Sequence, residues 1–106
     1  MQHSVREEGG VVVASLSGDV DLESSPRARE LLLGLVRGGR SVLVELSAVG
    51  YIDSSGVASL IEAFQLARRA GTGFALVSPT PSALRVLQLA RLDRVFTIHA
   101  TLADAL

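Results

Sequence analysis

The order of its apolar segments is the feature that most constrains how this chain folds. After an opening pair of predicted strands, short runs rich in β-branched residues alternate with stretches whose apolar residues recur at helical spacing. The predicted order is β-β-α-β-α-β-α-β-α. Strands that alternate with helices require right-handed crossovers, which pack the helices against a sheet. We therefore expect an α/β fold in one domain over residues 1–106, with a mixed sheet of four to five strands and about four helices packed against it.

Short apolar runs and turn residues locate the strands. The strands are predicted over residues 5–8, 11–17, 41–46, 73–78 and 95–98. Gly9-Gly10 suits a tight hairpin turn between the first two strands. Residues 42–44, Val-Leu-Val, are typical of a strand buried on both faces. We expect residues 18–21 to leave the second strand, and residues 47–52 to form a short loop.

Capping residues locate the helices. A helix is expected to begin at Ser25-Pro26, because proline at the first helical position gives up no needed N–H group. A second helix follows Asp53 and a third opens at Thr80-Pro81. Thr101, with Asp104 three residues later, resembles a capping box for a last helical turn.

Charge and residue usage exclude several classes of function. Ten basic and eleven acidic residues give a net charge of −1, and the basic residues are scattered arginines, which argues against binding of nucleic acid. The absence of cysteine excludes a disulfide framework, a thiolate zinc site and a cysteine nucleophile. The only histidines, His3 and His99, are far apart in sequence and favour neither a metal site nor a Ser-His-Asp site. We therefore expect no enzyme activity, no metal and no cofactor.

The N-terminal residues and the short apolar runs bear on localisation. Glu7 and Glu8 stand where a signal peptide would need a basic region and an apolar core. No apolar run approaches the ~20 residues that span a bilayer. We expect a soluble, cytoplasmic protein without direct membrane insertion.

The segment Asp53-Ser54-Ser55-Gly56 carries the clearest functional signal. It joins a predicted strand to a predicted helix, so two hydroxyls and a carboxylate lie at a helix N-terminus, where free N–H groups favour negative charge. One interpretation is that Asp53 or Ser54 simply caps the helix. A cap needs only one of these polar side chains, which leaves two over. We expect Gly56 to keep the first turn free of a side chain, so that the hydroxyls are approachable.

Three segments together resemble a known family. They are Gly-Asp-Val-Asp at residues 18–21, the stretch 45–56 with Glu-Leu-Ser at its start and Ile-Asp-Ser-Ser-Gly at its end, and Leu-Asp-Arg-Val-Phe at residues 92–96. In this order and spacing the chain resembles a STAS domain, specifically a stand-alone bacterial anti-sigma factor antagonist, over essentially its whole length. The resemblance implies a small mixed sheet with helices packed against it, in agreement with the predicted element order.

The resemblance also implies residue roles and partners. It assigns the phosphoacceptor to Ser54, with Ser55 beside it, and implies that Asp21 lies next to the acceptor and helps to present it. Asp53 and Gly56 would shape the site. The implied partner is a protein that is both a serine kinase and an anti-sigma factor. It would bind the unphosphorylated chain and be released on phosphorylation, regulating sigma-factor-dependent transcription.

Several alternatives stay open at this point. The same fold could serve as an accessory subunit of a membrane ABC transporter for lipids, or bind a nucleotide weakly at the start of the helix at Ser54. Which sigma factor is regulated, and whether a phosphatase removes the phosphate as a further partner, cannot be read from these residues.

Overall fold

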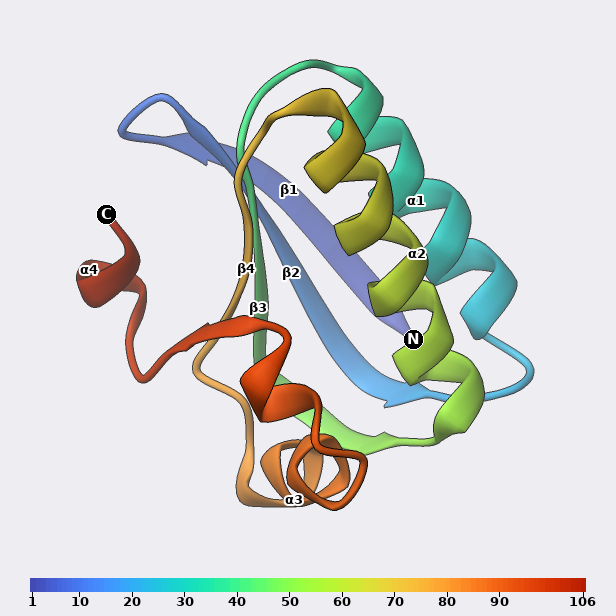
Figure 1. Ribbon diagram of the computed structural model, residues 1–106. Coiled ribbons are helices and arrows are strands. Elements are labelled where there is room, and N and C mark those ends of the chain that lie inside the picture. Colours follow the sequence, from blue (N-terminus) through green and yellow to red (C-terminus); the bar gives the residue numbers. More distant parts are fainter.

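A computed structural model describes residues 1–106 and contains one five-stranded sheet in the order β1-β2-β3-β4-β5 (Figure 1). The strands are β1 (Gln2–Glu8), β2 (Val11–Val20), β3 (Val42–Ile52), β4 (Phe74–Val77) and β5 (Thr97–His99). Strand β1 pairs antiparallel with β2, and every other neighbouring pair is parallel. The mixed α/β fold expected from the sequence is thus confirmed.

The helices lie on both sides of the sheet and at one end of it. They are α1 (Ser25–Arg37), α2 (Ser54–Ala70), α3 (Pro81–Leu89) and α4 (Leu102–Ala105), with a short 3-10 helix η1 (Leu92–Arg94). Helices α1 and α2 lie side by side on one face, while α3 lies at the end of the sheet where β2 and β3 finish (Figure 1). The short helix α4 lies away from α1 and α2, across the sheet.

The hydrophobic core is divided unequally by the sheet. The larger cluster has 22 buried residues, and it fills the space between the sheet and helices α1 and α2. The smaller cluster, on the other face, contains only Val13, Leu43, Ala75 and Val77 and is covered by Leu102 and Ala105. The large core therefore holds α1 and α2 firmly, and their N-termini are positioned by the ends of β2 and β3.

Strands β2 and β3 run further than the sequence pattern predicts. Their pairing continues to Val20 opposite Ile52, so residues 18–20 do not leave the strand and residues 47–52 do not form a loop. Register shifts between Ser15 and Ser17 and between Gly18 and Asp19 interrupt the two-residue alternation, which hides these strand ends in the sequence. As a consequence, β3 passes almost directly into α2.

Other strand bounds differ by a few residues. Strand β1 begins at Gln2, and β5 covers Thr97–His99 because the Val95 N–H group donates to Leu92 O and closes η1 instead. Phe96 is buried, with its ring centroid 5.3 Å from that of Phe64 in an edge-to-face arrangement. This aromatic contact holds the segment after η1 against helix α2.

Candidate functional site

The first turn of α2 is capped by Asp53. Its backbone is extended, with φ −110° and ψ −174°, and its Oδ1 atom accepts the N–H groups of Ser55 at 3.0 Å and Gly56 at 3.1 Å. The Ser55 hydroxyl also donates to the same oxygen at 2.5 Å. The capping interpretation therefore holds, with Asp53 as the cap and Ser55 as its second donor.

Ser54 is the polar side chain that capping leaves free. It is the first residue of α2, it is exposed, and its hydroxyl makes no hydrogen bond within the molecule. The sequence suggested that two polar side chains would be left over, but the bond from Ser55 to Asp53 reduces them to one. Only the Ser54 hydroxyl is available to a second molecule without breaking a bond.

Asp53 also ties the start of α2 to the loop that follows β2. Its Oδ2 atom accepts the Leu22 N–H group at 3.1 Å, and its own N–H group donates to Val20 O at 3.3 Å. Leu22 itself is 77% exposed. The β2–α1 loop is thus held beside Ser54, with an apolar side chain directed into solvent.

Asp21 shapes that loop and makes no hydrogen bond to Ser54. Its Oδ1 atom accepts the Ser24 N–H group at 3.1 Å and lies 3.1 Å from Ser24 Oγ. The Asp21 N–H group in turn donates to Ser24 Oγ at 3.0 Å. A short polar side chain that bonds the backbone three residues on is the usual chemistry of such turns. Asp21 therefore acts on the site through the conformation of residues 21–24.

Both carboxyl groups are stabilised in the ionised form. The pKa of Asp53 is lowered, first by the hydrogen bond from the Ser55 hydroxyl and then by the N–H group of Gly56. The pKa of Asp21 is lowered chiefly by the N–H group and hydroxyl of Ser24, while the negative charge of Asp53 opposes this shift. Ser54 therefore follows a carboxylate that stays charged at neutral pH.

Gly56 is needed for packing rather than for access to the hydroxyls. It is buried, and a Cβ atom at this position would lie 2.3 Å from Val20 O and 2.8 Å from Ile52 Cγ1. Only glycine lets the first turn of α2 approach the end of β2 this closely. Close packing against β2 is therefore the reason for glycine at this position, in place of the expected role of keeping the hydroxyls approachable.

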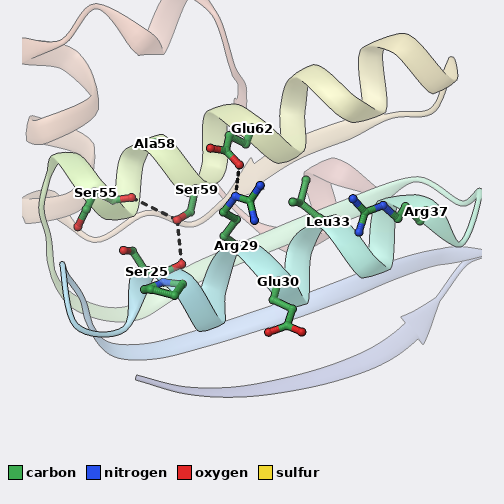
Figure 2. Close-up of a pocket in the computed structure, with 10 residues that line it drawn as sticks. Ser25, Arg29, Glu30, Leu33, Arg37, Ser55, Ala58, Ser59 and Glu62 are labelled. Atoms are coloured by element: carbon green, nitrogen blue, oxygen red, sulfur yellow. Dashed lines mark hydrogen bonds and ion pairs between the residues drawn. The ribbon is translucent and has the colours of Figure 1, made fainter.

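A buried serine fastens α2 to α1 behind the site. Ser59 is 4% exposed, and its hydroxyl donates to Ser25 O at 3.1 Å and lies 3.2 Å from Ser55 O (Figure 2). Further along α1 and α2, Arg29 of α1 forms an ion pair with Glu62 of α2 (Figure 2). The sequence interpretation missed Ser59, although a serine among the apolar residues of α2 was a visible signal. The bonds of Ser59 hold the first turn of α2, which carries Ser54, against the start of α1.

An apolar groove lies on the other side of α2, with Ser54 at its rim. Its volume is about 380 Å³, and Ser54 is the one polar residue that lines it. The remaining lining residues are Val57, Ala58, Ile61, Val86, Ala90 and Leu92. Sequence spacing placed Val57 and Ile61 on the core-facing side of the helix, and it could not show that α3 and η1 would leave a groove beside them.

No three His, Asp or Glu side chains come together in a way that could hold a metal ion. His3 in β1 and His99 in β5 lie on the two edge strands, and neither is hydrogen-bonded to Ser54 or Ser55. None of the helices combines the length and the apolar character that crossing a membrane requires.

Family comparison identifies the class of protein to which this fold and site belong. The family model of the STAS domain matches residues 2–105, so the chain belongs to the STAS domain family. The sequence is 30% identical over 104 residues to the anti-sigma-F factor antagonist RsfB of Mycobacterium tuberculosis, and the match covers 97% of this chain and 84% of RsfB.

Solved structures agree with this assignment. The crystal structure of an anti-sigma factor antagonist from Mycobacterium paratuberculosis superposes with a TM-score of 0.88 and 29% identity, covering 98% of this chain and 89% of that one. The phosphorylated form of the Bacillus cell fate determinant SpoIIAA superposes with a TM-score of 0.75 and 20% identity, covering 98% and 96%. At that lower identity, the second likeness concerns the fold.

Proposed function

We propose that this protein is an anti-sigma factor antagonist that acts by partner switching. It binds an anti-sigma factor with serine kinase activity while Ser54 is unmodified, and it releases that partner once Ser54 carries a phosphate. The observation that carries the proposal is the free, exposed Ser54 hydroxyl at the rim of an apolar groove. The name of RsfB and the phosphorylated form of SpoIIAA support it.

The surface around Ser54 has the features of a docking site. The groove offers apolar side chains that gain free energy when a partner covers them. Leu22, 77% exposed on the loop held by Asp53, offers a second apolar anchor. A partner that contacts both would bring its own surface directly over the Ser54 hydroxyl, where a kinase active site would have to be.

Phosphorylation of Ser54 would change the charge of this surface far more than its shape. The phosphate adds about −1.5 to −2 charges. The N-terminus of α2 stabilises such a charge by about 0.3–1 kcal/mol, so the fold should tolerate it. A docked partner would instead have to desolvate the phosphate next to the ionised Asp53, which costs several kcal/mol. We expect the affinity to fall about hundredfold, since each 1.4 kcal/mol is about a factor of ten.

The identity of the acceptor can be tested by phosphorylation in an extract of the source cells with ATP, followed by phosphopeptide mapping. Wild type and Ser55→Ala should be phosphorylated, whereas Ser54→Ala should not. Ser82→Ala is the matched control, because Ser82 is also an exposed serine in the first turn of a helix. Phosphorylation of Ser54→Ala at the wild-type rate would show that Ser54 is not the acceptor.

The switch itself can be tested by affinity capture of the partner, identified by mass spectrometry. Wild type and Ser54→Ala should retain an ATPase-type partner, and Ser54→Asp should lose it. Ser82→Asp, which adds the same charge to the start of α3, should bind like wild type. Equal recovery with all four proteins would contradict switching and would favour a permanent subunit, such as that of a transporter.

A further inference from the structure

The outer edge of β1 is open over its whole length. All backbone hydrogen bonds of Gln2–Glu8 to other strands go to β2, and the strand lies at the end of the sheet order. Arg6 braces the strand, since it donates to Ser15 Oγ at 2.9 Å while Ser15 donates to Glu45 at 2.7 Å. A braced edge with unpaired N–H and C=O groups is a template for another strand.

We propose that β1 pairs antiparallel with β1 of a second copy of this chain, about a two-fold axis midway between the two Val5 residues. Such an axis is perpendicular to the sheet, so the side chain of a given residue points to the same face of the sheet in both copies. Because side chains alternate between faces, only residues of the same parity can then stand opposite each other. The axis must therefore lie midway between one residue of β1 and its own copy, which leaves very few registers.

The register centred on Val5 is the one that the strand favours. It pairs all seven residues of Gln2–Glu8, whereas an axis between the two Ser4 residues would leave Glu7 and Glu8 outside the paired strand. An axis between the two Arg6 residues would place these arginines opposite each other, and like charges directly opposite are unfavourable. The backbone and the charges thus select the same register.

Side chains in this register are complementary. Val5, an apolar residue that is 45% exposed in the single chain, meets Val5 of the second copy at the centre. The flanking cross-strand pairs are His3 with Glu7, Ser4 with Arg6, and Gln2 with Glu8, each present twice. No pair joins like charges, and the histidine can donate a hydrogen bond to the glutamate. These are the features of an isologous interface between two copies.

The dimer would join two five-stranded sheets into one continuous sheet. Because the two-fold axis reverses the strand direction, the ends that carry Ser54 would face away from each other. Each copy could then bind its own partner, and the inference does not depend on what Ser54 does. Self-association and the proposed switch can therefore fail independently.

A charge exchange across the interface tests this register. Sedimentation velocity over a wide range of concentrations should show wild type approaching twice the 11.1 kDa of one chain. His3→Glu places glutamate opposite Glu7, and Glu7→Lys removes the attraction to His3, so each should weaken the dimer about tenfold because each acts twice. The double variant His3→Glu/Glu7→Lys should restore the dimer, since glutamate and lysine then face each other.

The opposite edge of the sheet provides the control. Thr97→Glu adds a similar charge to the exposed edge strand β5 and should leave the dimer unchanged. Glu7 also forms an ion pair with Arg40 of its own chain, but this contact is lost equally in Glu7→Lys and in the double variant. A wild-type chain that stays at 11.1 kDa, a dimer insensitive to His3→Glu, or a double variant no better than Glu7→Lys would each overturn the proposal.

Discussion

Helices α2 and α3 begin with the same local chemistry, yet only one of them forms the candidate site. In α2 the Asp53 side chain accepts the Gly56 N–H group at 3.1 Å, and in α3 the Thr80 hydroxyl accepts the Ala83 N–H group at 3.2 Å. Each helix also has an exposed serine in its first turn. A cap and an exposed hydroxyl at a helix start are therefore not enough to define a site.

The difference lies in what surrounds each cap. Thr80 donates a hydrogen bond to Val49 O at 2.8 Å, which anchors α3 near the C-terminal end of β3. Asp53 instead holds the Leu22 N–H group, and the helix it caps approaches β2 so closely that the third residue must be glycine. At the same position α3 has a buried alanine, Ala83. The site at α2 thus arises from two converging strand ends rather than from the helix alone.

The largest expected effect is that of a methyl group at this third position of α2. Gly56→Ala should destabilise the protein by about 3 kcal/mol or more, since the new Cβ atom would lie 2.3 Å from the backbone oxygen of Val20, which cannot turn aside as a side chain can. At the matching position of α3, Ala83→Gly should cost about 1.5–2 kcal/mol, from helix propensity and one lost buried methyl group. Urea unfolding measures both values.

A second glycine provides the control for replacing glycine by alanine within a helix. Gly34 lies in α1, and apart from its chain neighbours and the backbone of its own helix, no atom would lie within 4 Å of a Cβ atom there. Gly34→Ala should therefore stabilise the fold by about 0.5–1 kcal/mol. A Gly56→Ala protein as stable as wild type would mean that α2 does not lie as close to β2 as described.

Removal of the two caps should have smaller and unequal effects. Thr80→Ala should cost about 1 kcal/mol, as is usual for the loss of an N-cap hydroxyl. Asp53→Ala should cost more than Thr80→Ala, because it also releases Leu22 and the Ser55 hydroxyl. Urea unfolding compares the two, and hydrogen exchange at the Leu22 amide should accelerate only in Asp53→Ala. Equal losses, with Leu22 still protected, would show that Asp53 acts as a local cap alone.

The sequence predicted the order of elements and the capping of α2 because both depend on neighbouring residues. Alternating apolar periods and capping residues fix where strands and helices occur, and Asp53 caps as its type and position indicate. The strand ends were missed because the register shifts near Ser15 and Gly18 depend on how β2 pairs with β3. The groove beside Ser54 and the packing of Gly56 depend in the same way on elements far along the chain.

Strong acid should weaken the contacts that the ionised Asp53 makes. The pKa of Asp53 is lowered from its ordinary value of 3.8 in the folded protein, so its stabilising contribution is complete above pH 3.8 and is lost as the pH falls through the folded pKa. Asp53→Asn should therefore be less stable than wild type at neutral pH, and the two should converge in strong acid. Asp93→Asn, on the exposed surface of η1, is the control and should follow the wild-type curve.

The smallest expected effect on stability concerns the exposed serines. Substitutions of these serines in α2 and α3 should differ in their effect on partner binding and hardly in their effect on stability. Ser54→Asp and Ser82→Asp each put a carboxylate into a first helical turn, so each should change stability by no more than about 0.5 kcal/mol. Ser54→Asp should gain less than Ser82→Asp, because the ionised Asp53 precedes it. If unfolding experiments show both variants intact while only Ser54→Asp loses its partner, the loss must come from charge at the docking surface. Unfolding of Ser54→Asp would instead mean that the start of α2 cannot hold a second negative charge, and a phosphate there would then act by disrupting the fold.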